Sequence, residues 1–153
     1  MTPDVSVSRD IAASPSTVFA ALTDITRMGE WSPETYEAEW NEGFDSPTVG
    51  AMFTGHNRNG DKEWSVPAKI TELVADERFV FDCVAGSTGE VFATWGYAIE
   101  PIDGGSRVTE KWHDLRSQVI IDAGASISGV ADRKEHNRAG MEATLERLAN
   151  ALE

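Results

Sequence analysis

The sequence is poor in the residues that build covalent cross-links and metal sites. It contains one cysteine, Cys83, and three histidines. A lone cysteine excludes an intramolecular disulfide and a cysteine-based zinc site. The histidines, His56, His113 and His136, do not stand at a metal-ligand spacing such as His-Glu-x-x-His. The sequence also lacks a glycine-rich phosphate loop and the Gly-x-Ser-x-Gly setting of a serine nucleophile. We therefore expect no metal and no cofactor.

Basic residues and long apolar runs are also scarce. Lys and Arg number 13 against 26 Asp and Glu, which gives a formal net charge of −13. Nucleic acids and anionic membranes attract clustered basic residues, so neither is an expected partner. No segment approaches the about 18 consecutive apolar residues of a membrane span, and the opening MTPDVSVSRD lacks the pattern of a secretory signal. We therefore expect a cytoplasmic protein, either a monomer or a homodimer.

What the sequence does contain is a clear order of predicted elements. Alternating apolar residues predict a strand over residues 4–11. Ser14-Pro15 then predicts the start of a short helix, with serine as the N-cap and proline at the first helical position. A second short helical turn is expected over residues 27–31, and it should end before Pro33 because a residue preceding proline avoids the helical region.

The middle and the end of the chain differ in periodicity. Turn signals separate six predicted strands, at residues 36–41, 51–58, 64–73, 79–85, 91–100 and 107–115. Their short connections favour antiparallel pairing. Helical spacing then returns in a short helix near residues 119–123, broken near Gly124 or Gly129, and in a long helix over residues 130–152. This order predicts an α+β fold.

Several motifs resemble those of one known family. They are Asp24–Glu34 (DITRMGEWSPE), Val49–Asn57 (VGAMFTGHN), Trp95-Gly-Tyr97 with Glu100-Pro101, Gly104–Glu110 (GGSRVTE) and His136–Leu145 (HNRAGMEATL). In their order and spacing they resemble the polyketide cyclase/dehydrase-like branch of the START-like (SRPBCC) superfamily. The resemblance implies a single helix-grip domain over residues 1–153. In that fold a curved antiparallel sheet of about seven strands wraps around a long C-terminal helix and encloses a hydrophobic cavity.

Strand alternation predicts which side chains face that cavity. Residues two apart share a face of a strand, so each strand contributes its bulky alternate residues to the inner face. The predicted inner face is mostly aromatic with two polar members, and it comprises Phe53, Asn57, Trp64, Phe79, Phe81, Trp95, Tyr97, Glu110 and Trp112. From the long helix we add Met141. Gly55 is expected to leave space in the wall. A dry core is the alternative interpretation of each aromatic residue, and the family resemblance favours a cavity for the set.

Glu110 is the most informative of these positions. A carboxyl group that faces a tryptophan-rich cavity is desolvated and can act as an acid or a base. Glu110, Tyr97 and Asn57 are therefore the candidate catalytic residues. The alternative is a salt bridge to the long helix, where Lys134 and Arg138 interrupt the apolar stripe. We predict that Arg138 reaches Glu110 and forms a polar floor that binds the oxygen end of a ligand.

Three functions fit these observations. The first is binding or transport of a hydrophobic or aromatic small molecule, such as a lipid, a steroid or a polyketide. The second is cyclase, dehydratase or aromatase activity on a polyketide-like chain through general acid–base chemistry. The third is a protein-interaction module of the co-chaperone kind. An aromatic inner face without a complete nucleophilic or metal-binding set favours the first.

Overall fold

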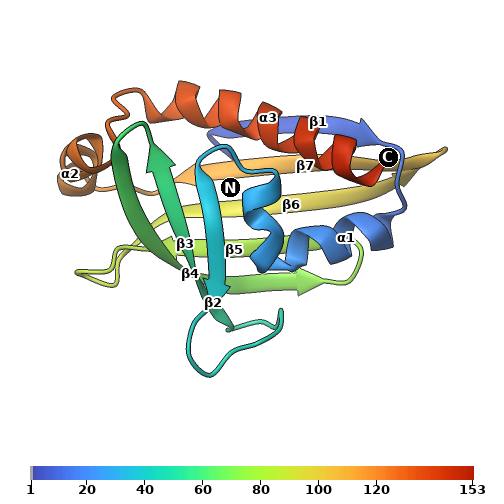
Figure 1. The fold of residues 1–153 in the computed structure, drawn as a ribbon, viewed down its shortest axis with the longest axis horizontal. Helices are drawn as coiled ribbons and strands as arrows, with labels where there is room; N and C mark the ends of the chain where they lie inside the picture. The colour runs from blue at the N-terminus through green and yellow to red at the C-terminus, as the bar shows by residue number, and fades with distance from the viewer. Residues whose placement is uncertain (1) are drawn as a thin grey trace.

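A computed structural model describes residues 2–153 of the chain. Its strands are β1 (Val5–Ile11), β2 (Thr35–Trp40), β3 (Met52–Asn59), β4 (Lys62–Val74), β5 (Arg78–Val84), β6 (Val91–Ile102) and β7 (Gly105–Asp114). Its helices are α1 (Pro15–Thr23), the 3-10 helix η1 (Ile25–Glu30), α2 (Gln118–Ser128) and α3 (Arg133–Leu152). The predicted order of elements is confirmed (Figure 1).

The seven strands form one antiparallel sheet in the order β1-β7-β6-β5-β4-β3-β2. Register shifts lie in β2 between Thr35 and Glu37, in β4 between Ile70 and Glu72, and in β6 between Val91 and Ala93, which are opposite Val84 and Cys83 of β5. Such bulges bend a strand and increase its twist. As a result β2 and β3 run steeply across the direction of β6 and β7, and α3 lies along the β1 side of the sheet (Figure 1). The helix-grip fold is thus confirmed.

Local capping explains where the helices begin and end. The side chain of Ser14 accepts a hydrogen bond from the Thr17 amide at the start of α1, as predicted. Gly124 does not break α2, which continues to Ser128 and ends at Gly129 with a left-handed φ of 72°. The long helix begins at Arg133, later than predicted, because Asp132 is its N-cap.

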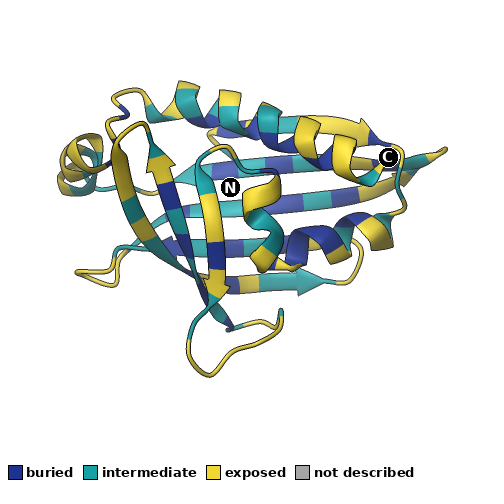
Figure 2. Cartoon of the chain, viewed as in Figure 1, coloured by how far each residue is buried: buried dark blue, intermediate teal, exposed yellow. Residues whose placement is uncertain are grey.

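The core lies between the concave face of the sheet and the buried faces of α1 and α3 (Figure 2). Phe79 on β5 is fully buried there. Its ring stacks on Tyr97, with centroids 6.3 Å apart, and lies 5.4 Å from the ring of Phe81. On α3, Met141 and Leu145 are buried and belong to the same core. The end of the sheet that carries Phe79 is therefore packed as a dry core.

Replacing Phe79 with alanine should lower the free energy of unfolding by about 3 kcal/mol, because a fully buried aromatic ring leaves a void. Phe81→Ala on the same strand is the matched control. Phe81 borders the cavity described below, so its removal enlarges an existing space and should cost less. Urea unfolding of both variants measures the difference. Equal losses of unfolding free energy would contradict the assignment of Phe79 to the dry core and Phe81 to the cavity wall.

Candidate ligand-binding site

A cavity of about 660 Å³ lies between the inner face of the sheet, α2, α3 and the segment 31–35 that precedes β2. Small-molecule sites span roughly 300–1,000 Å³, so this volume is large enough for a polycyclic ligand. Its wall is mostly apolar and includes the aromatic residues Trp31, Phe53, Trp64, Phe81, Phe92, Trp95, Tyr97 and Trp112. The Arg27 guanidinium lies 5.0 Å from the centroid of the Trp31 ring and supports this tryptophan from outside.

Most of the residues predicted for the inner face do line the cavity. They are Phe53, Asn57, Trp64, Phe81, Trp95, Tyr97, Glu110, Trp112 and Met141. Their part in ligand binding stays a prediction. Phe79 does not line the cavity, because it is packed within the dry core. Gly55 lies in the wall, but the Thr35 methyl group would be 3.4 Å from a Cβ at Gly55, so Thr35 occupies the space expected there.

The predicted contact between Arg138 and Glu110 is wrong. Arg138 does not line the cavity, and Glu110 instead accepts a hydrogen bond of 2.9 Å from the Tyr97 hydroxyl. The reason lies in the helical step upstream of Met141. Asn137, four residues before Met141, is buried, whereas Arg138, three residues before it, is partly exposed. Both spacings fit 3.6 residues per turn, so the periodicity alone does not distinguish Asn137 from Arg138 as the buried position.

The Glu110 carboxyl is buried in an apolar part of the wall. Burial raises its pKa from 4.5 to about 8, and the hydrogen bond from Tyr97 opposes this rise. The same burial, together with the nearby carboxyl, raises the pKa of Tyr97 well above 10. Oε1 of Glu110 is buried and has no hydrogen-bond partner among the described residues. At neutral pH the cavity therefore contains an uncharged acid beside a phenol.

Asn57 and Cys83 are two further polar residues of the wall. The Thr35 hydroxyl donates a hydrogen bond to Oδ1 of Asn57. Burial raises the pKa of the Cys83 thiol to about 12, so Cys83 is a neutral, unreactive part of the wall. Within residues 2–153, no group of three or more His, Cys, Asp or Glu side chains is placed to hold a metal ion.

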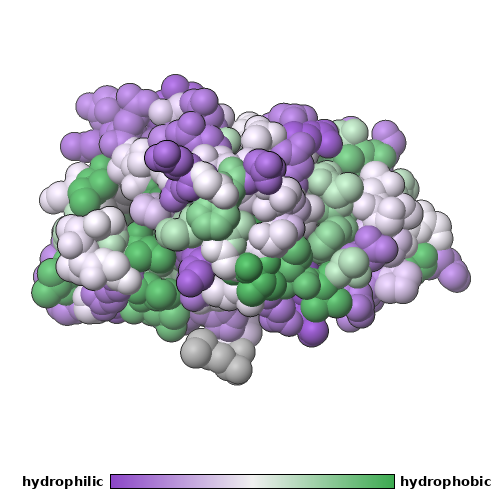
Figure 3. Space-filling model, turned by 90° about the horizontal axis from the view of Figure 1, so that it is seen from below, coloured by the Kyte–Doolittle hydropathy of each residue, from purple (hydrophilic) through white to green (hydrophobic). Residues whose placement is uncertain are grey.

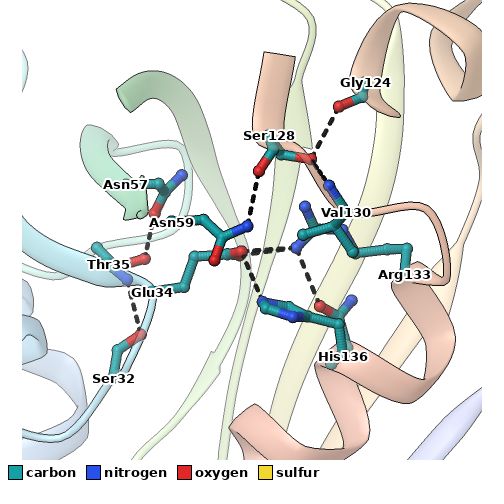
Figure 4. Close-up of polar contacts among 11 residues, drawn as sticks. Ser32, Glu34, Thr35, Asn57, Asn59, Gly124, Ser128, Val130, Arg133 and His136 are labelled. Atoms are coloured by element: carbon teal, nitrogen blue, oxygen red, sulfur yellow. Dashed lines mark hydrogen bonds and ion pairs between the residues drawn. The ribbon is translucent and has the colours of Figure 1, made fainter. Parts of the chain in front are cut away.

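A charged cluster that the sequence pattern did not predict lies at the mouth of the cavity (Figure 4). Nη1 of Arg133 donates to both carboxylate oxygens of Glu34 at 2.8 Å and to Oδ1 of Asn137 at 3.3 Å. Nε2 of His136 lies 3.1 Å from Oε2 of Glu34. Nearby, the Asn59 amide donates to the Ser128 carbonyl at 2.8 Å. The mouth cluster (Glu34, Arg133, His136 and Asn137) joins the first turns of α3 to the segment before β2.

A signal for this cluster was present in the sequence. Arg133 and Asn137 are four residues apart, and continuing that step reaches Met141 on the buried face of α3. The partner, Glu34, belongs to the Trp-Ser-Pro-Glu motif, but no sequence rule places that motif beside the start of a helix about 100 residues later. The contact depends on the tertiary fold.

Glu34→Gln should lower the free energy of unfolding by about 1–2 kcal/mol, because a neutral side chain with one acceptor oxygen replaces the charged partner of Arg133. The side chains of Arg133 and Glu34 are only 15% and 23% exposed, so solvent replaces the contact poorly. Glu30→Gln is the control, because the Arg27–Glu30 ion pair lies on the surface and is 38% and 53% exposed. Chemical denaturation measures the loss of unfolding free energy in both variants. Equal losses would contradict a larger contribution of the mouth cluster to stability.

Comparison with known proteins identifies the family. The chain matches the family described as "Polyketide cyclase / dehydrase and lipid transport" over residues 2–153. It belongs to this family and thus to the START-like (SRPBCC) superfamily, as the sequence motifs implied. Comparison with curated proteins gives no match.

Solved structures show the same fold. The Polyketide_cyc-like protein Cgl2372 from Corynebacterium glutamicum is 29% identical, with a TM-score of 0.63 and coverage of 97% of this chain and 90% of that one. Protein CV1439 from Chromobacterium violaceum has a TM-score of 0.73 at 16% identity, covering 97% and 95%. The di-domain ARO/CYC StfQ from the steffimycin biosynthetic pathway has a TM-score of 0.70 at 12% identity, and the match covers 97% of this chain but 49% of StfQ.

Proposed function

We propose that this protein binds or carries a hydrophobic or aromatic small molecule of lipid-, steroid- or polyketide-like character in its cavity. The cavity itself supports the proposal: about 660 Å³ of space lies between the sheet and the helices, and its wall is mainly apolar and contains eight aromatic side chains of the described residues. Such a wall gives apolar contact area, and a few polar groups set the orientation of the ligand. In the part of the chain that the structure describes, no helix is both long and apolar enough to cross a membrane.

A fluorescent apolar probe tests this function directly. N-phenyl-1-naphthylamine (NPN) is uncharged and becomes brighter in an apolar environment. We expect saturable binding with one NPN per chain, together with a rise in thermal stability through mass action. Linear, non-saturable fluorescence without thermal stabilisation would contradict a defined internal site.

A second candidate function is supported by the pair formed by Glu110 and Tyr97. A buried acid with a pKa of about 8, hydrogen-bonded to a phenol, can move protons near neutral pH. The same cavity would then fold a polyketide-like chain for cyclisation, dehydration or aromatisation. Turnover of a poly-β-keto substrate that disappears in Glu110→Gln, while that variant stays folded, would support this activity. Retained turnover would remove Glu110 from the catalytic role.

The third function, a protein-interaction module, receives less support from the surface. The large exposed apolar residues are spread over β2, two loops and α2, and comprise Tyr36, Phe44, Val49, Leu115, Val119 and Ile127. On the face drawn in Figure 3, apolar side chains are interspersed with hydrophilic ones. Apolar residues scattered in this way are common on soluble proteins and need no partner.

A further inference from the structure

The inner end of the cavity contains a carboxyl group that lacks one hydrogen bond. Glu110 is in the middle of β7, where it is opposite Tyr97 of β6 and Val7 of β1. Tyr97 donates to Oε2, and Oε1 has no partner among the described residues. An unsatisfied buried polar atom is costly, so a partner for it would stabilise the structure. Because the side chain of Glu110 forms part of the cavity wall, that partner can come from a ligand.

Among residues 2–153, no positively charged side chain is paired with Glu110. In the part of the chain that the structure describes, three arginines line the cavity, and each has another contact. Arg133 of α3 is paired with Glu34, Arg116 is paired with Asp114 at 2.8 Å, and Arg58 lies over the Tyr36 ring. On the neighbouring strands, Val7 and Tyr97 are opposite Glu110, and Phe79 is opposite Tyr97. These three side chains carry no positive charge.

Other titratable groups of the wall do not compete for the Glu110 proton. Cys83 remains a neutral thiol, and His136 on α3 is hydrogen-bonded to Glu34 in the mouth cluster. Glu110 therefore stays protonated at neutral pH and loses its proton near pH 8. Below that pH its carboxyl is a hydrogen-bond donor, and above it the carboxylate can only accept.

We propose that the pair of Glu110 and Tyr97 selects apolar ligands that contain a neutral carbonyl group, with the carbonyl oxygen accepting a hydrogen bond from the Glu110 carboxyl. Tyr97 already donates to Oε2, so the proton of the acid is carried by the other oxygen, which is free to donate. The O–H can turn about its own C–O bond while Oε2 keeps the hydrogen bond from Tyr97, so it can point towards a ligand. A ligand carboxylate is disfavoured, because it would bury a charge without a cation. This inference rests on the proposed binding function.

A matched pair of tricyclic probes tests the inference. Fluorene and 9-fluorenone share one apolar skeleton, and only fluorenone contains a carbonyl group. Each is titrated against bound NPN, and the ratio of their affinities is the readout. The wild type is compared with two variants. Glu110→Met removes the hydrogen bond, and Glu110→Gln keeps an N–H donor but cannot ionise. All three proteins are measured at about pH 6.5 and about pH 9.5, on either side of the Glu110 titration.

At the lower pH, the preference of the wild type for fluorenone over fluorene should exceed that of Glu110→Met by about tenfold, as expected for one hydrogen bond to a buried group. Raising the pH should remove this preference in the wild type and leave it unchanged in Glu110→Gln. The infrared carbonyl stretch of bound fluorenone should shift to lower frequency only where the preference is seen.

The outcomes separate the two proposals. Equal affinity ratios in the wild type and Glu110→Met, or a wild-type ratio that does not change with pH, would overturn the carbonyl inference while leaving apolar binding intact. Failure of NPN and both tricyclic probes to bind would overturn the binding function itself. If Glu110→Met does not fold, the pH dependence of the wild type against Glu110→Gln still decides the question.

Discussion

Replacing Ala68 with phenylalanine is expected to reduce the affinity of the cavity for NPN by about 100-fold, or about 2.7 kcal/mol. Ala68 is buried on β4 and faces the cavity between Phe53 of β3 and Cys83 of β5. A benzyl group there would fill the space that the ligand needs. Because the cavity already holds about 660 Å³ of free space, the new ring should fit with little cost to folding.

Lys69→Phe is the matched control for this experiment. Lys69 is the next residue of β4 and is exposed on the outer face of the sheet, so the same new side chain lies outside the cavity. NPN titrations should show unchanged affinity in this variant, and thermal unfolding should show that both variants are folded. A folded Ala68→Phe protein that binds NPN as tightly as the wild type would mean that NPN binds elsewhere.

The second large effect concerns Glu110 and the pH dependence of stability. Burial raises the pKa of Glu110 from 4.5 to about 8 in the folded protein. Between these values the unfolded chain releases the proton and the folded protein keeps it, so the free energy of unfolding falls as pH rises. The fall is about 1.4 kcal/mol per pH unit, and it stops above about pH 8, where both states are ionised.

Glu110→Gln should remove this contribution. Between about pH 5.5 and about pH 8, the wild type should lose about 3 kcal/mol of unfolding free energy relative to Glu110→Gln. A hydrogen bond altered by the substitution would add only a constant offset. Urea denaturation at several pH values measures the slope, and Glu146→Gln, an exposed position on α3, serves as the control. A difference that is independent of pH would contradict a buried, protonated Glu110.

Much of the fold could be predicted because local signals agree with one another. The alternation in β6 and β7 places Tyr97 and Glu110 on the inner face, and the structure confirms that both line the cavity. The capping signal Ser14-Pro15 marks the start of α1 correctly. These predictions depend only on the period of two in a strand and on helix capping, both of which are properties of the local sequence.

The errors in the site have a different origin. Phe79 has the same strand parity as Phe81, so alternation assigned both to the cavity, and only the three-dimensional packing places Phe79 in the dry core. The sequence pattern predicts a partner for Glu110 on the long helix, but the partner is Tyr97, directly opposite on β6. The curvature of the sheet decides which part of the inner face is filled by side chains and which positions of α3 reach that face. The sequence pattern does not determine this curvature.

The indole N–H signals of the five tryptophans test the central claim most directly. Trp31, Trp64, Trp95 and Trp112 line the cavity, whereas Trp40 does not line it and makes a T-shaped contact with the ring of Phe53. In a ¹H–¹⁵N correlation spectrum titrated with NPN, we expect the four cavity signals to shift together and to saturate with one ligand per chain, and the Trp40 signal to move least. Saturable NPN binding that leaves the four cavity signals in place would contradict an internal ligand site.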